Sequence, residues 1–180
     1  MPATTASPPA HSIRRFLLLA AGLYLLWFFG YEQWLQPDGR LDAALSVNIA
    51  AVSGAVLRVL GFPASIAIHN PNLLMMGRHM AVFVGDPCNG LVLYALFTGF
   101  VLAYPGPVRR KLWFIPAGIL AIYLLNIVRV AVLALNHLYS HQTVEFNHHY
   151  TFTFVVYAFI LLLWMLWVSR LSLPTEPAGS

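Results

Sequence analysis

The stretch LWFIPAGILAIYLLNIVRVAVLAL, residues 112–135, decides the fold class of this chain. Arg129 is its only charged side chain, and the stretch is longer than the roughly 20 apolar residues that cross a bilayer as an α-helix. Of the 180 residues, 59% are hydrophobic and 9% are charged, whereas a soluble domain carries about 25% charged residues. The sequence therefore predicts an integral membrane protein.

Three other apolar runs come near the spanning length, and with the first they form one membrane-embedded domain over residues 13–171. The predicted spans are residues 16–35, 89–104, 112–135 and 150–168, and polar tails at residues 1–12 and 172–180 flank them. The predicted fold class is an all-α integral membrane protein. It has about four transmembrane helices, an interfacial amphipathic helix and a short β-hairpin on the outer face.

The interfacial helix is predicted for residues 41–60, an apolar segment that polar side chains interrupt. These side chains are Asp42, Ser46, Asn48, Ser53 and Arg58. A segment of this length could instead cross the bilayer as a further span.

Basic residues distinguish the two alternatives, because they favour the cytoplasmic flanks of membrane spans. If residues 41–60 do not cross, then Arg14, Arg15, the basic cluster at residues 109–111 and Arg170 all lie on the cytoplasmic side. If they cross, these basic residues no longer share one side of the membrane. We therefore expect a multi-pass protein of the inner (cytoplasmic) membrane with a cytoplasmic N-terminus. Since the basic residues gather at the ends of apolar runs, we expect no nucleic-acid partner.

Residues 65–84 alternate apolar with polar or small side chains. Turn residues occur at Asn70, Pro71 and Asn72 and again at Gly77 and Arg78. A period of two with such residues predicts a short hairpin on the outer face.

The predicted topology brings three kinds of functional side chain to the outer face. Cys88 lies at the start of the second span, Arg129 near the end of the third, and His148 and His149 at the start of the fourth. Each has a simpler explanation, because a buried cysteine packs as a small hydrophobe, an arginine can extend to the interface and histidines are common at helix starts. Together, however, they indicate acyl-transfer chemistry.

A metal site is a further alternative, since His137 and His141 would share a helix face close to the other two histidines. Glu145 is the only nearby carboxylate and there is no HExxH motif. We therefore predict no metal and no cofactor.

The proposed nucleophile is Cys88, the only cysteine in the chain. A thiolate forms more readily at a helix N-terminus or beside a cation. Pro87 suits a helix start, so the N–H groups of Asn89, Gly90 and Leu91 are expected to point toward the sulfur. Gly90 would also let a substrate backbone approach closely.

Histidine can remove the thiol proton and later protonate the leaving amine, and arginine can stabilise the oxyanion that forms when a thiolate attacks a carbonyl. We expect one of His148 and His149, with a preference for His149, to act as acid and base, and Arg129 to stabilise the oxyanion. Asp86 could orient these groups or, more simply, cap the helix.

Three motifs in order resemble the exosortase and archaeosortase family of membrane-embedded cysteine transpeptidases. They are PCNGL at 87–91, NIVRV at 126–130, which begins with Asn126, and FNHHYTF at 146–152. The run YPGPVRRKLWFIPAGI between the first two is also similar, and the exosortase X type is the closest. The resemblance covers roughly residues 65–170. Longer exosortases have more spans and commonly a serine in place of Asn89.

The resemblance implies that Cys88 is the nucleophile, Arg129 the transition-state stabiliser and one histidine the acid and base. It also implies substrates that are exported proteins with a C-terminal sorting tail, which the enzyme cleaves through an acyl-thioester, and a link to exopolysaccharide export. Water or an acceptor amine could resolve the thioester. The alternative is a non-catalytic membrane scaffold of an exopolysaccharide export system, in which Cys88 only packs.

Overall fold

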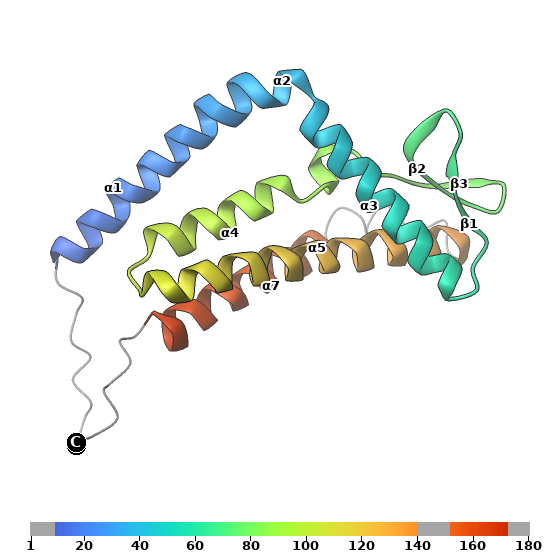
Figure 1. Ribbon diagram of the computed structural model, residues 1–180. Coiled ribbons are helices and arrows are strands. Elements are labelled where there is room, and N and C mark those ends of the chain that lie inside the picture. Colours follow the sequence, from blue (N-terminus) through green and yellow to red (C-terminus); the bar gives the residue numbers. More distant parts are fainter. Residues whose placement is uncertain (1–9, 140–151, 173–180) are drawn as a thin grey trace, which may run out of the picture.

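The computed structural model describes residues 10–139 and 152–172, which are mostly helical. In chain order the elements are α1 (Ala10–Trp27), η1 (Phe28–Leu35), α2 (Gln36–Asp38), α3 (Arg40–Val59), β1 (Ala64–Ala67), β2 (Asn70–Met76), β3 (His79–Phe83), η2 (Asp86–Cys88), α4 (Leu91–Ala103), α5 (Val108–Tyr139), α7 (Phe152–Leu166) and η4 (Trp167–Leu171). Helices α4, α5 and α7 run side by side. Helix α3 and the strands lie beside the C-terminal part of α5 (Figure 1). The predicted all-α membrane fold with a small β element is confirmed.

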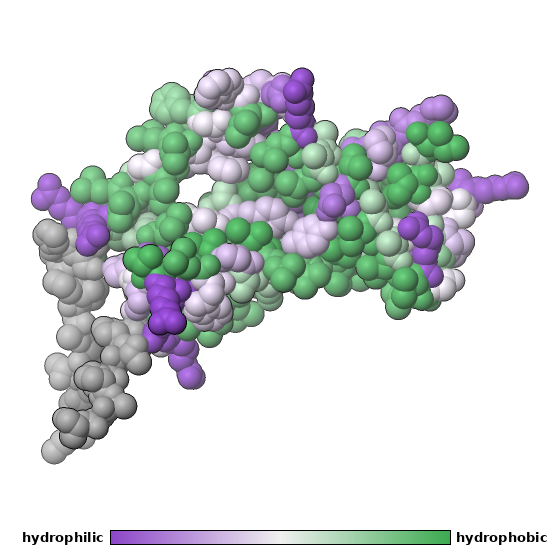
Figure 2. Space-filling model, viewed as in Figure 1, coloured by the Kyte–Doolittle hydropathy of each residue, from purple (hydrophilic) through white to green (hydrophobic). Residues whose placement is uncertain are grey.

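Four helices of the described residues are long and apolar enough to cross a membrane. They are Ile13–Asp38, Arg40–Val59, Val108–His137 and Phe154–Leu171. Three of them match predicted spans. The fourth, α3, is the segment predicted to be interfacial, which by length and composition also qualifies as a span. Helix α4, predicted as residues 89–104, is shorter at 13 residues. Hydrophobic residues cover most of the visible surface, and hydrophilic residues gather mainly toward its ends (Figure 2).

Three of the five polar interruptions of α3 face the protein. Asp42, Ser46 and Ser53 are buried, while Leu41, Val56 and Val59 are exposed. Ser53 Oγ donates to the Ile127 carbonyl at 3.4 Å. These three polar side chains therefore face the rest of the fold, whereas Asn48 and Arg58 are exposed.

The β element has three antiparallel strands in the order β1-β2-β3, one more than the predicted hairpin. The turn at Gly77 and Arg78 occurs as expected, and Gly77 has a φ of 61°. Pro71, by contrast, lies inside β2, and the first turn is formed by Ile68 and His69. Pairing of Ala64 with Met76 and of Leu74 with Val82 turns one face of the sheet toward the protein interior.

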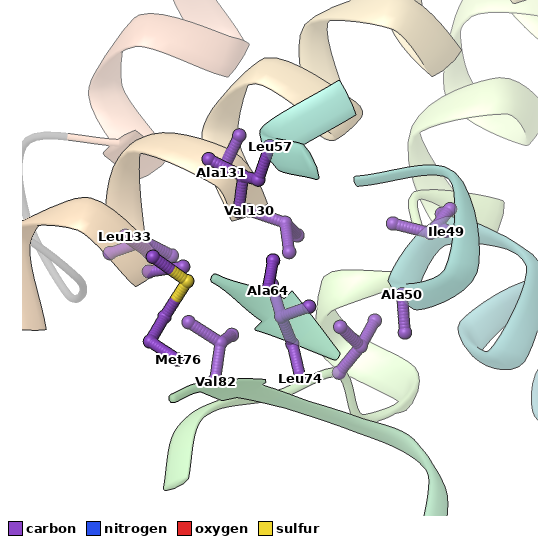
Figure 3. Packing of buried hydrophobic residues seen from close by; sticks show 12 residues of the cluster. Ile49, Ala50, Leu57, Ala64, Leu74, Met76, Val82, Val130, Ala131 and Leu133 are labelled. Carbon is purple, nitrogen blue, oxygen red and sulfur yellow. The ribbon is translucent and has the colours of Figure 1, made fainter. Parts of the chain in front are cut away.

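Within residues 10–139 and 152–172, buried hydrophobic residues form two clusters, which we call the sheet core and the bundle core. The sheet core joins α3, the three strands and the C-terminal part of α5, and Leu57, Leu74 and Val130 are among its residues (Figure 3). The bundle core joins α4, the N-terminal part of α5, α7 and η4, with Phe97 and Trp167 among its residues. Helix α5, 32 residues and about 48 Å long at 1.5 Å per residue, contributes to both.

Basic side chains close one end of the bundle. Lys111 Nζ donates to the carbonyls of Leu102 and Tyr104 at the end of α4, both at 2.8 Å. Arg110 Nη1 donates to the Leu171 carbonyl at the end of η4, at 2.9 Å. Positive charge at helix C-termini is favourable because the last carbonyls are unsatisfied and the helix dipole is negative there. The start of α5 and the ends of α4 and η4 therefore meet at the same end of the bundle.

Candidate active site

Cys88 closes a single 3-10 turn, η2, between the sheet and α4. Its backbone N–H donates to the Gly85 carbonyl at 2.8 Å, and the Asn89 N–H donates to the Asp86 carbonyl at 3.3 Å. The Leu91 N–H donates to Asn89 Oδ1 at 2.9 Å. The expectation that the N–H groups of Asn89 and Leu91 point to the sulfur is therefore wrong, because both already have acceptors. The thiol lies in a turn before the helix and not at its first residue.

Arg129 approaches this turn from α5. Its Nη2 atom lies 3.7 Å from Cys88 Sγ, and the two residues are 41 positions apart in the sequence. Both side chains are half-buried. An arginine that only extended to the membrane edge would not be directed at a thiol. A guanidinium is permanently charged and has donors on several sides, so it can stabilise negative charge on sulfur or on an oxygen next to it.

A buried polar network also holds the turn that contains Cys88. Asp42 of α3 is 1% exposed. Its carboxyl oxygens accept from the Tyr31 hydroxyl at 2.9 and 2.8 Å and from Asn89 Nδ2 at 2.6 Å. Asn89 is therefore held at both ends, since its Nδ2 binds Asp42 and its Oδ1 accepts from Leu91. The residue after the thiol is tied to η1 and α3 as well as to the start of α4.

Asn126 lies one turn before Arg129 on the same side of α5. It is 1% exposed, and it lies against Gly90, since a Cβ atom at Gly90 would overlap Asn126 Nδ2. Gly90 has a φ of 81°, a left-handed conformation that favours glycine. The two predicted supporting residues Gly90 and Asn126 thus come together beside the turn of Cys88.

Comparison with known proteins assigns the family. The family model described as Transmembrane exosortase (Exosortase_EpsH) matches residues 3–168. The chain belongs to the transmembrane exosortase family. No curated protein and no solved structure matches it. The expected family resemblance is confirmed, and the match covers nearly the whole chain, including the Cys88 turn and the Arg129 region.

The remaining predicted residues of this exosortase differ in what the structure shows of them. Asp86 is exposed and lies in η2. Helix α4 begins after Gly90 without a side-chain capping bond, and the N–H of its first residue, Leu91, donates to Asn89 Oδ1. His148 and His149 lie outside the described residues, as do His141 and Glu145 of the alternative metal site. Their roles stay predictions.

Sequence reasoning missed three residues of the site. Asp42 and Tyr31 form the network behind Asn89, and Tyr94 of α4 lies with Asn126 at Gly90. A signal for Asp42 was present, because a carboxylate within an apolar segment is costly unless it is paired inside the protein. The two tyrosines carried no such signal, since tyrosine is common at membrane interfaces.

Proposed function

We propose that this exosortase family member is a membrane cysteine peptidase or transpeptidase that cleaves the C-terminal sorting tails of exported proteins at the outer membrane surface. The contact of Arg129 Nη2 with Cys88 Sγ at 3.7 Å carries the proposal. It joins the only thiol of the chain to a group that stabilises developing negative charge. A scaffold subunit would not require this pair.

The proposed reaction begins when a histidine from the pair at 148 and 149 takes the thiol proton. The Cys88 sulfur then attacks the scissile carbonyl carbon, and the carbonyl electrons move to oxygen beside Arg129. Collapse of this intermediate breaks the carbon–nitrogen bond, and the histidine returns its proton to the leaving amine. Water or an acceptor amine then resolves the thioester, which regenerates the thiol and gives hydrolysis or transpeptidation.

The length of α5 supports an outer-surface site. The basic residues Arg109, Arg110 and Lys111 begin this helix and favour the cytoplasmic side. About 20 residues of helix cross the hydrocarbon core, so a span that starts at this cluster ends close to Arg129. The part of α5 beyond Arg129 packs in the sheet core with α3 and the strands. We place α3 and the sheet on the exterior side, with the N-terminus in the cytoplasm of a cell whose inner membrane holds the protein.

The course of α7 supports the histidine assignment. The end of η4 is fixed near the start of α5 by the bond from Arg110 to Leu171. Helix α7 has 15 residues and η4 has 5, so together they run back about 30 Å along α5. Their start at Phe152 is then level with Arg129, and His149 precedes Phe152 by three residues in the sequence.

The proposed substrate enters from the membrane. Its hydrophobic tail helix packs against the lipid-facing side of the bundle, where Leu96, Leu120 and Leu124 are among the exposed hydrophobic residues. Its scissile bond then lies at the outer surface, where the chain leaves the bilayer. Partners of this kind are exported proteins, and an exopolysaccharide export system is a further proposed association.

The test is the processing of a co-expressed exported protein that carries a sorting tail. Cys88→Ala should leave the substrate full-length while the variant still inserts and folds. Because the chain has a single cysteine, a thioester adduct trapped on the wild-type protein must be at Cys88. Wild-type processing by Cys88→Ala would leave only the scaffold function.

A further inference from the structure

Two polar groups beside the proposed nucleophile are buried without a well-formed hydrogen bond among the described residues. They are the amide of Asn126, whose Nδ2 and Oδ1 atoms both lack one, and the hydroxyl of Tyr94, which lies beside that amide. Buried polar groups are almost always paired, because an unpaired one loses its hydrogen bonds to water without replacement. At membrane depth water is scarce, so the loss is harder to avoid. The Tyr94 hydroxyl can pair with only one of the donor and acceptor sites of the Asn126 amide, so the remaining sites point to a missing ligand.

Both groups converge on Gly90. A Cβ atom there would overlap Asn126 Nδ2 and would lie 3.3 Å from the Tyr94 hydroxyl oxygen. Gly90 follows Cys88 by two residues, and Asn126 precedes Arg129 by three. Helix α5 therefore presents two groups to this turn, with Arg129 next to the sulfur and Asn126 next to Gly90.

Asn126 lies on the bundle side of the thiol. Three residues of α-helix correspond to about 4.5 Å along the axis, and this step leads from Arg129 toward the bundle core, where Ile122 is buried. In the opposite direction Val130 belongs to the sheet core. In the topology proposed above, the bundle side is the membrane side, which is where the tail of a substrate enters.

We propose that Asn126 binds the main chain of the substrate just after the scissile bond, where the tail enters the bilayer. A carboxamide has donors on nitrogen and an acceptor on oxygen, so it matches a peptide unit: Nδ2 donates to a substrate carbonyl and Oδ1 accepts from a substrate N–H. Tyr94 is a second donor to the same segment. This inference rests on the proposed function and assigns Asn126 to recognition of an unwound backbone.

The cleavage chemistry requires such a group. Around the scissile bond the substrate must be extended for the sulfur to reach the carbonyl, so its peptide groups lose the bonds of the tail helix. In an apolar environment those groups need partners from the enzyme. Contacts to the main chain do not depend on side-chain identity, so Asn126 would serve any tail sequence. Ligand binding would also supply the hydrogen bonds that Tyr94 alone cannot give to the amide.

The decisive variant is Asn126→Leu, which keeps the approximate volume and removes both unpaired atoms. Replacing unpaired buried polar atoms by apolar atoms of similar shape is neutral or stabilising. We expect an unchanged or higher Tm, an unchanged rate of Cys88 alkylation by a small maleimide, and substrate processing at least about tenfold slower, since a single lost hydrogen bond can change a rate by that factor. Asn126→Asp, which keeps the acceptor and loses the donor, should also be slow.

The matched control is Asn48→Leu. Asn48 lies on α3, where its Oδ1 accepts from the Tyr123 hydroxyl at 2.6 Å, and its loss should leave processing unchanged. Wild-type processing by Asn126→Leu, while Cys88→Ala is inactive, would overturn this inference and leave the proposed function intact. A large fall in the Tm of Asn126→Leu would show a structural role and overturn it as well. Normal processing by Cys88→Ala would overturn both proposals.

Discussion

The network behind Cys88 gives the sharpest stability prediction. Asp42 is 1% exposed and accepts from two donors, the Tyr31 hydroxyl and Asn89 Nδ2. Asp42→Ala leaves both donors buried and unpaired, and each such group costs about 1–3 kcal/mol. The expected loss of unfolding free energy is therefore about 2–6 kcal/mol. At about 2–4 °C per kcal/mol for a chain of this size, a loss of about 4 kcal/mol lowers the Tm by roughly 8–16 °C.

The assay is thermal unfolding in detergent, with Asp38→Ala as the matched control. Asp38 forms an exposed ion pair with Arg40 at 3.6 Å, and its side chain is 53% exposed. Exposed ion pairs contribute about 0–1 kcal/mol, so the control should change the Tm by only a few degrees. Asp42→Asn keeps one acceptor and should fall between the two. Equal Tm values for Asp42→Ala and Asp38→Ala would refute the reasoning that this network holds the turn.

Three further predictions concern the site and the bundle. Arg129→Gln should slow substrate processing by about 100-fold, as the loss of an oxyanion donor does. The control Arg58→Gln removes only a 3.4 Å bond to the Ala64 carbonyl and should leave processing unchanged. Equal processing by both variants would contradict the role of Arg129 as oxyanion stabiliser. Gly90→Ala should destabilise the protein by about 1–3 kcal/mol, because φ is 81° and the new Cβ overlaps Asn126 Nδ2. In a double-mutant cycle, the same substitution should cost less when Asn126 is already alanine. Gly118→Ala should lower the free energy of unfolding by about 1–3 kcal/mol, because the new Cβ forces the Phe97 ring away. A Cβ at Gly99 has nothing within 4 Å, so Gly99→Ala should be neutral or stabilising in the same unfolding assay.

Hydrophobic run length alone predicted most of the membrane fold. Three of the predicted spans coincide with helices long enough to cross a bilayer, because the need to satisfy every backbone group in lipid leaves few options. The pairing of Cys88 with Arg129 was also predictable in outline, since alternating membrane crossings bring the start of one span and the end of the next to the same side. Their 3.7 Å contact agrees with that outline.

The direction of the polar residues of α3 was not predictable. Asp42 and Ser53 interrupt an apolar segment in the same way whether they face water or the protein, and their partners Asn89 and Ile127 are distant in the sequence. The third strand was missed for a related reason. The pattern Asn70-Pro71-Asn72 predicts a turn, yet Pro71 lies within β2. Only tertiary pairing distinguishes these cases, and a single sequence contains no record of it.

The position of the site follows from the two cores. Residues of α5 up to Ile122 pack in the bundle core and those from Val130 onward pack in the sheet core, so Asn126 and Arg129 occupy the junction. Polar groups are costly within either cluster, but at a junction they can face a turn of another segment, as Arg129 faces Cys88. In the proposed topology, a helix that crosses the bilayer and continues into a second core has this junction near the membrane surface. The thiol would then lie at the depth where the proposed substrate tail leaves the lipid.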